Sequence, residues 1–140
     1  FYLIPLTNPK IVSVIFLLLI CISTDIGGFV FGSIIGGKKI TKVSPNKTYS
    51  GIVGSFIFSI IFGYLFRNYY NETLIIKSNI LILIILTSSI SQFGDLMISF
   101  LKRKAKIKDS GSILPGHGGI LDRIDGMLLA LPIGLAMISY

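Results

Sequence analysis

Long apolar segments are the feature that most restricts how this chain can fold. Four of them follow one another, over residues 11–37, 51–66, 78–101 and 126–140. A helix needs about 20 residues to cross the hydrocarbon of a bilayer. The second segment is therefore only marginally long enough, and the fourth is shorter than a full span. Backbone amides have no water partners in lipid, and the segments lack the alternation of barrel strands. The predicted fold is therefore all-α, an integral membrane, polytopic bundle of about four transmembrane helices.

Composition supports a membrane location, because 52% of the 140 residues are hydrophobic and only 14% are charged. A soluble domain of this length would need far more polar surface. The chain begins at Phe1, and the last apolar segment runs to Tyr140. We therefore expect residues 1–140 to be a single membrane-embedded region of a longer polytopic protein.

Basic residues are concentrated in the connections between the apolar segments and give the chain a net charge of +7. The first and third connections are the most basic, whereas the second carries Arg67 and Lys77 against Glu72. The positive-inside rule predicts that the first and third connections face the cytoplasm, as across a bacterial inner membrane. Lipid headgroups and nucleotide phosphates are the expected counter-charges, and nucleic acid is not an expected partner.

Acidic residues occur inside two of the apolar segments, at Asp25 and Asp95. A charge at the centre of a membrane helix costs about 2.5 to 3.5 kcal/mol, so such an acid usually faces the bundle interior and serves a site. A structural alternative stays open, in which each acid pairs with a lysine and holds helices together. Ser99 follows Asp95 by one turn, and two bases follow by about two turns, at Lys102 and Arg103. An acid and two bases are therefore expected to border one polar pocket.

The third connection combines a glycine-rich loop with paired carboxylates. Asp122 and Asp125 are three residues apart at the start of the last helix, so both can project from one face beside Arg123. Paired carboxylates suit a hard divalent cation such as Mg²⁺. Upstream lie two loop motifs, Lys108-Asp109-Ser110-Gly111 and Pro115-Gly116-His117-Gly118-Gly119.

The loop motifs have the composition of an anion cradle. Glycines without a Cβ let backbone N–H groups approach a phosphate, and the following helix N-terminus adds positive dipole. His117 alone is as often a structural hydrogen bonder as a catalyst, and both interpretations stay open. In the first segment Gly28, Gly32 and Gly36 recur every four residues, which predicts close approach of another helix.

Together these motifs resemble the signature of the phosphatidate cytidylyltransferase (CDP-diacylglycerol synthase) family. The residues that carry the resemblance are Gly94-Asp95-Leu96, Ser99, Lys102-Arg103, Lys108-Asp109-Ser110-Gly111, Leu114-Pro115-Gly116-His117-Gly118-Gly119 and Leu121-Asp122-Arg123-Ile124-Asp125. Two upstream stretches are also similar to the family, Ser44-Pro45-Asn46-Lys47-Thr48 before Gly51, and Asp25 with Gly27, Gly32 and Gly36. The sequence departs at Ser50, Phe29 and Ser33, where the family usually has glutamate, tyrosine and often a basic residue. The chain resembles the C-terminal, catalytic half of such a protein.

The resemblance implies a nucleotidyltransferase of phospholipid synthesis, in which a phosphatidate oxygen attacks the α-phosphorus of CTP to give CDP-diacylglycerol and pyrophosphate. It implies Mg²⁺ held by Asp95, Asp122 and Asp125, with a second cation left open. The bases expected to neutralise phosphate charge, with roles in catalysis or substrate binding, are Lys47, Lys102, Arg103 and Arg123. The other residues expected on the substrate side are Asp25, Ser44, Ser99, Lys108, Asp109, His117, Gly118 and Gly119. The implied partners are CTP, phosphatidate and the lipid bilayer, and a homodimer is left open.

Three other interpretations stay open. A related CTP-dependent transferase would act on another lipid phosphate. A truncated remnant would be inactive. A transporter or ion-conducting subunit would use Asp25 and Asp95, but that interpretation does not account for the glycine-rich loop followed by Asp122 and Asp125.

Overall fold

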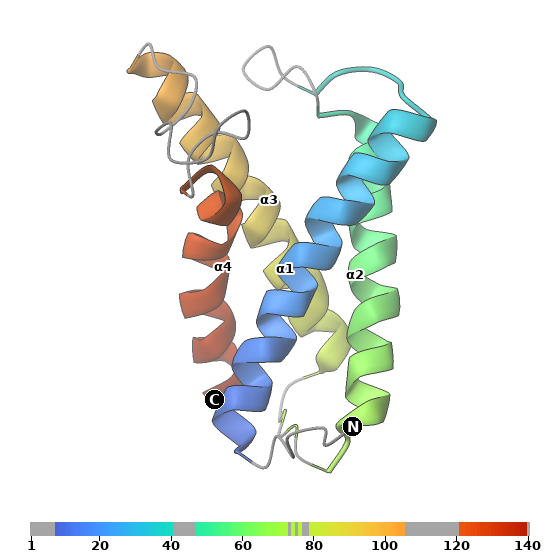
Figure 1. Ribbon diagram of the computed structural model, residues 1–140, viewed down its shortest axis with the longest axis vertical. Coiled ribbons are helices and arrows are strands. Elements are labelled where there is room, and N and C mark those ends of the chain that lie inside the picture. Colours follow the sequence, from blue (N-terminus) through green and yellow to red (C-terminus); the bar gives the residue numbers. More distant parts are fainter. Residues whose placement is uncertain are drawn as a thin grey trace, which may run out of the picture.

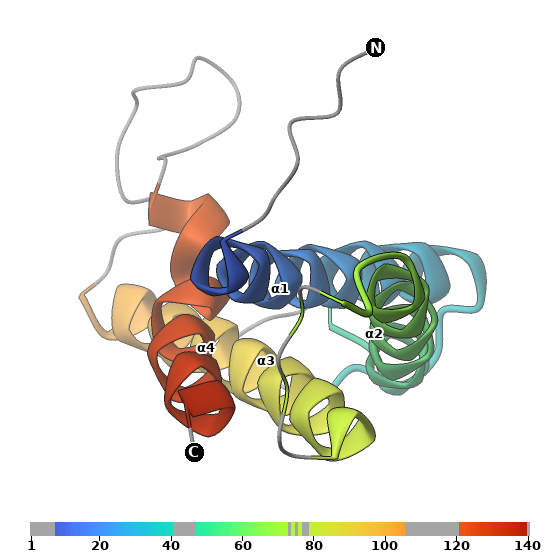
Figure 2. The same cartoon turned by 90° about the horizontal axis from the view of Figure 1, so that it is seen from below.

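The computed structural model describes residues 8–40, 47–72, 74, 76, 79–105 and 121–139, without the side chains of 121–125 and 139. The described residues form four helices, α1 (Pro9–Ile34), α2 (Tyr49–Tyr69), α3 (Ile80–Lys104) and α4 (Leu121–Ser139). α1 contacts each of the other three, most extensively α2, and α4 packs mainly on α3. Figures 1 and 2 show this arrangement from the side and from below. The prediction of an all-α polytopic bundle is confirmed.

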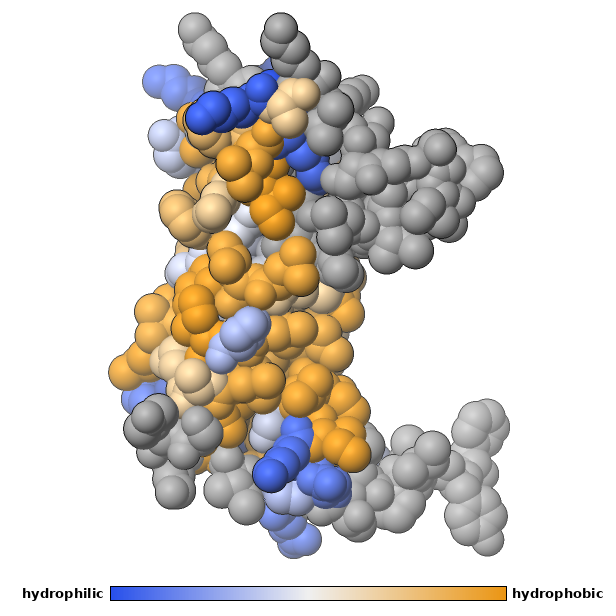
Figure 3. All heavy atoms as spheres, turned by 90° about the vertical axis from the view of Figure 1, so that its left-hand side faces the viewer, coloured by the Kyte–Doolittle hydropathy of each residue, from blue (hydrophilic) through white to orange (hydrophobic). Residues whose placement is uncertain are grey.

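Within the part of the chain that the structure describes, α1, α2 and α3 are long and apolar enough to cross a membrane, and α4 contributes a shorter apolar stretch, Gly126–Ile138. The chain is an integral membrane protein. Figure 3 shows hydrophobic side chains across the middle of one face and hydrophilic ones toward both ends. The bundle therefore presents an apolar band to lipid between two polar ends.

The second apolar segment is not marginal, because α2 has 21 residues and extends beyond both ends of residues 51–66. At about 1.5 Å per residue it spans roughly 31 Å, which matches the hydrocarbon core. The hydroxyl of Thr48 starts the helix by accepting a hydrogen bond from the N–H of Gly51 at 3.2 Å. Polar and aromatic residues from Arg67 to Tyr69 continue it past the apolar run.

The first helix ends earlier than predicted, at Ile34 rather than residue 37. Gly36 and Gly37 have φ angles of 64° and 115°, in the left-handed region that turns the chain out of a helix. Because of this turn, Gly36 does not lie on the helix face with Gly28 and Gly32. A Cβ added at Gly36 would meet nothing within 4 Å, so the prediction that this glycine packs against another helix is wrong.

The prediction of close helix packing is confirmed for the other two glycines, which face α2. A Cβ at Gly28 would lie 2.8 Å from Ser55 Oγ, and one at Gly32 would lie 3.1 Å from Thr48 Oγ1. The closest approach to a backbone atom of α2 involves Gly27, where a Cβ would lie 2.5 Å from the carbonyl oxygen of Gly54. The backbones of α1 and α2 therefore touch without side chains between them.

The interior is apolar in one half of the bundle and polar in the other. The apolar half includes Phe16, Leu17 and Ile20 of α1 with Leu83 and Ile84 of α3. One turn further along α1, buried hydroxyls take over from apolar side chains. The polar half of the interior leads to the candidate site.

The first polar contacts join three helices. Thr24 Oγ1 of α1 lies 2.9 Å from Ser88 Oγ of α3, and Ser55 Oγ of α2 donates to the carbonyl oxygen of Thr24 at 2.7 Å. Interhelical hydrogen bonds of this kind act together with close packing to hold helices together in a membrane.

Candidate functional site

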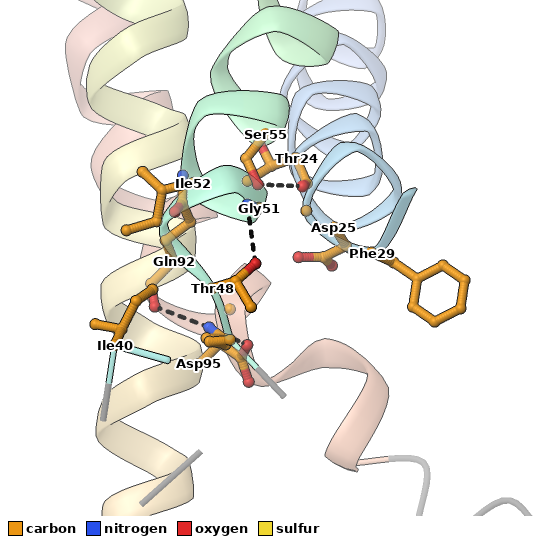
Figure 4. A pocket seen from close by; sticks show the side chains of 13 residues that line it. Thr24, Asp25, Phe29, Ile40, Thr48, Gly51, Ile52, Ser55, Gln92 and Asp95 are labelled. Atoms are coloured by element: carbon orange, nitrogen blue, oxygen red, sulfur yellow. Dashed lines mark hydrogen bonds and ion pairs between the residues drawn. The ribbon is translucent and has the colours of Figure 1, made fainter. Parts of the chain in front are cut away.

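A cavity of about 300 Å³ lies in the polar half of the bundle (Figure 4). Its described wall combines residues of all four helices and of the connection between α1 and α2. The lining residues are Thr24, Asp25, Gly28, Phe29, Ile40, Lys47, Thr48, Gly51, Ile52, Ser55, Gln92, Asp95 and Gly126. Convergent polar groups in a concave site inside a membrane bundle mark a functional site.

An ion pair crosses the cavity wall from the α1–α2 connection to α3. Lys47 Nζ lies 2.5 Å from Asp95 Oδ2, and the two side chains are 26% and 35% exposed. The same ammonium group lies 3.5 Å from the carbonyl oxygen of Gln92. Asp95 therefore forms the acid–lysine pair that the structural alternative predicts for an intramembrane acid. The pair also lines the cavity, so both charges are available to a bound ligand.

A second carboxylate, Asp25 of α1, lines the cavity opposite α3. Figure 4 shows it pointing toward Thr48, whereas the ring of Phe29 points away from the cavity. Asp25 interacts electrostatically with both Asp95 and Lys47. In their ionised forms these two carboxylates and one ammonium group leave the described wall with a net negative charge. An unliganded wall of this charge favours a cation and disfavours an anion that arrives alone.

The donors in the wall match the chemistry of a hard cation. Asp25 and Asp95 supply carboxylate oxygens, and Thr48 and Ser55 supply hydroxyls nearby. Oxygen ligands of this kind are those that Mg²⁺ takes, usually with water and substrate phosphate completing its shell. Within the described residues there is no group of three or more histidine, cysteine or acidic side chains. The other two predicted metal ligands, Asp122 and Asp125, have side chains outside the described residues.

The start of α4 lies next to α3 at the height of the cavity. Gly126 lines the cavity, and a Cβ added to it would lie 2.7 Å from the carbonyl oxygen of Ser91. A Cβ at Gly94 would likewise lie 3.4 Å from Gly126 Cα. Because Asp125 directly precedes Gly126 in the chain, this contact brings the acidic end of α4 to the α3 face that carries Asp95.

Other predicted site residues on α3 lie beyond the cavity. Ser99, Lys102 and Arg103 are not among its lining residues. Arg103 is two turns past Asp95, which corresponds to about 12 Å along the helix axis. Lys102 and Arg103 belong to the basic last turn of α3, Ser99 lies between that turn and Asp95, and the roles of all three stay predictions.

The side chains of the remaining predicted site residues lie outside the part of the chain that the structure describes. Ser44, Lys108, Asp109, His117, Gly118 and Gly119 lie outside the described residues, and so do the side chains of Asp122, Arg123 and Asp125. Their roles also stay predictions.

Several residues at the site escaped prediction from the sequence because each is an uncharged polar residue. Ser88, Gln92 and Asp95 are spaced by four and three residues, which places them on one face of α3. Thr24 precedes Asp25 directly and bonds to Ser88 across the helix interface. Polar residues at helical spacing around an intramembrane acid are the signal that would have found them.

Comparison with known proteins places the chain among cytidylyltransferases. The cytidylyltransferase family model matches residues 2–140. A phosphatidate cytidylyltransferase of Haemophilus influenzae is 40% identical over 114 residues, which cover 79% of this chain and 40% of the relative. A phosphatidate cytidylyltransferase of Helicobacter pylori is 39% identical over 130 residues, which cover 92% of this chain and 47% of the relative. A phosphatidate cytidylyltransferase of Rickettsia bellii is 39% identical over an alignment of 145 residues, which covers 94% of this chain and 60% of the relative. The chain spans about half the length of the curated relatives it matches.

Proposed function

Because the chain belongs to the cytidylyltransferase family, we propose that it carries the catalytic region of a phosphatidate cytidylyltransferase. The observation that supports this proposal most strongly is the polar cavity inside the bundle, where Lys47 and Asp95 pair within reach of Asp25. The reaction joins CTP and phosphatidate to give CDP-diacylglycerol and pyrophosphate. A site for it must accept a lipid phosphate and a nucleotide triphosphate together, and a polar cavity within membrane-spanning helices meets that need.

Charge is the main obstacle to this reaction, because both substrates are anionic. Lys47 supplies a positive charge in the described wall, and it neutralises phosphate once its contact with Asp95 is shared with the substrate. Arg123 and the bases at the end of α3, Lys102 and Arg103, are proposed to act on the same charge from the cytoplasmic side.

Mg²⁺ is proposed as the cofactor, and Asp95, Asp122 and Asp125 would hold it. Bound there, the ion would neutralise triphosphate charge and act as a Lewis acid on the phosphoryl group. The net negative wall and its oxygen donors support this assignment. Asp25, which faces the same cavity from α1, is proposed to orient the substrates.

In the reaction, a phosphate oxygen of phosphatidate forms a bond to the α-phosphorus of CTP. The bond between that phosphorus and the bridging oxygen to the β-phosphate breaks, and pyrophosphate leaves with the electron pair. Such transfers depend on positioning and electrostatic stabilisation rather than on a covalent intermediate with the protein. The described side chains therefore need only hold two phosphates in line and offset their charge.

The proposed orientation places the cavity end of the bundle in the cytoplasm, as across a bacterial inner membrane. In Figure 1, α1 ends, α2 begins and α3 ends at the same end of the bundle, so both basic connections leave from there. The lysine and arginine excess of these connections supports the cytoplasmic side. CTP would then reach the cavity from the cytoplasm.

The test is acceptor-dependent turnover by the purified protein in detergent with CTP and Mg²⁺. We expect CDP-diacylglycerol to form with phosphatidate and to be lost in Asp95→Asn. Product formation with a polyprenyl phosphate but not with phosphatidate would overturn the proposed acceptor. Absence of pyrophosphate release with either lipid would overturn the proposed reaction.

A further inference from the structure

Lys47 reaches Asp95 from a backbone that is held by the segment following α1. The carbonyl oxygen of Lys47 accepts a hydrogen bond from the N–H of Ile40 at 2.9 Å. Two residues later, the N–H of Tyr49 donates to the carbonyl oxygen of Lys38 at 3.3 Å. These bonds flank an antiparallel bridge between residues 39 and 48. The direction in which the Lys47 side chain leaves the backbone therefore depends on how this pairing is anchored.

Two hydroxyls anchor the pairing to the end of α1. Thr48 Oγ1 accepts from the N–H of Gly51 at 3.2 Å and lies 3.0 Å from Ser50 Oγ. Ser50 Oγ in turn donates to the carbonyl oxygen of Gly36 at 2.5 Å. A hydroxyl has one hydrogen, so the donation by Ser50 requires Thr48 to donate to Ser50. The bonds thus run in one direction from Gly51 to Gly36, an arrangement in which each bond strengthens the next.

The acceptor at the end of this relay lies in a fixed turn. Gly36 follows the last residue of α1 and its C-cap, and has a φ angle of 64°, so its backbone conformation strongly favours glycine. Gly36 is half-buried, and a carbonyl group removed from water needs a hydrogen-bond donor. Ser50, in the first turn of α2, supplies one, and so ties the start of α2 to the end of α1.

We propose that Ser50 is a positioning residue, an inference that rests on the proposed function. Its hydroxyl, acting through Thr48, fixes the start of α2 so that the ammonium group of Lys47 stays in the cavity beside Asp95. Without this hydroxyl, the Thr48 hydroxyl loses its acceptor and the carbonyl of Gly36 loses its side-chain donor. Lys47 then spends less of its time at the position where it meets Asp95 and phosphate.

Cross-linking tests the positioning without any need for turnover. A carbodiimide joins an amine to a carboxylate in direct contact, so the yield of the Lys47–Asp95 link, measured by mass spectrometry, reports how often the pair is formed. We expect Ser50→Ala to lower the yield about fivefold, the factor that one ordinary hydrogen bond corresponds to. Ser50→Thr, which keeps the hydroxyl, should restore it.

The matched control is Ser33→Ala. Ser33 Oγ donates to the carbonyl oxygen of Val30 at 3.0 Å, so this substitution removes a hydroxyl from the same end of α1 without a link to α2. The cross-link yield of the control should equal that of the wild-type protein. Thermal unfolding of all variants in the same detergent identifies any loss that comes from misfolding.

Kinetics separate positioning from general damage. If Lys47 binds phosphate equally in the ground and transition states, Ser50→Ala should raise the KM for CTP about fivefold and leave kcat within about twofold. A structural lesion would instead lower kcat through loss of active protein and leave KM unchanged. Ser50→Thr should return KM to the wild-type value.

The outcomes distinguish the two proposals. Cross-link yield and KM in Ser50→Ala that both match Ser33→Ala would overturn the positioning role while the proposed function stands. Loss of the cross-link in Ser50→Ala, with a wild-type protein that makes no product from CTP and phosphatidate, would support the positioning of Lys47 and overturn the function.

Discussion

The ion pair between Lys47 and Asp95 should couple the stability effects of its two residues. Nζ and Oδ2 are 2.5 Å apart, and the side chains are about two thirds to three quarters removed from solvent. With an effective dielectric constant of about 20, Coulomb's law gives roughly 7 kcal/mol at this separation as an upper limit. Partial exposure and the cost of desolvating both charges reduce the expected net coupling to about 1 to 3 kcal/mol.

A double-mutant cycle measures this coupling. Lys47→Met, Asp95→Asn and the double variant are compared with the wild-type protein by reversible unfolding in one detergent system. Each single variant leaves a partner without its counter-charge, so the double variant should lose less stability than the two single losses together. Lys39→Met, an exposed residue of the same connection, serves as the control and should change stability by less than about 0.5 kcal/mol. Coupling below about 0.5 kcal/mol, the range of independent sites, would show that the two charges do not stabilise each other.

Three further predictions concern the proposed metal site, the proposed orientation and the helix packing. Asp122→Asn should lower turnover at least about a hundredfold with membrane insertion intact, and near-normal activity that still requires Mg²⁺ would contradict its role as a ligand. Cysteines replacing Lys47 and Glu72, in a background without the native cysteine, should be labelled by an impermeant reagent from opposite sides of sealed vesicles, and labelling from one side would contradict the orientation. Gly27→Ala should destabilise the bundle by about 1 to 3 kcal/mol, because its Cβ would lie 2.5 Å from the carbonyl oxygen of Gly54, and an unchanged midpoint of unfolding would count against that contact.

The helical fold could be predicted because it depends on local chemistry. Apolar length and the absence of water partners for the backbone require helices whatever the tertiary arrangement. Because a charge in lipid is costly, the positions of Asp25 and Asp95 inside apolar segments mark them as candidate site residues. Both line the same cavity in the structure. Each of these inferences follows from a single segment of the chain.

What could not be predicted depends on how separate segments meet. Lys47 and Asp95 are 48 residues apart, and their contact requires the paired connection after α1 and the register of α2 against α3. The turn at Gly36 also lay beyond sequence reasoning, because the glycine spacing continues past the point where the helix ends. The length of α2 was also underestimated, because the helix continues through polar residues such as Arg67. Helix ends depend on capping and not on hydropathy alone.

The fate of labelled phosphorus shows whether this cavity transfers a cytidylyl group to phosphatidate, as we propose. The purified protein is incubated with phosphatidate, Mg²⁺ and CTP labelled at either the α- or the γ-phosphorus, and lipid and water-soluble products are separated. We expect the α-label to enter the lipid as CDP-diacylglycerol and the γ-label to leave as pyrophosphate, and we expect neither product to form in Asp95→Asn. A γ-label in the lipid, or an α-label that stays entirely in water-soluble compounds, would contradict the proposed transfer.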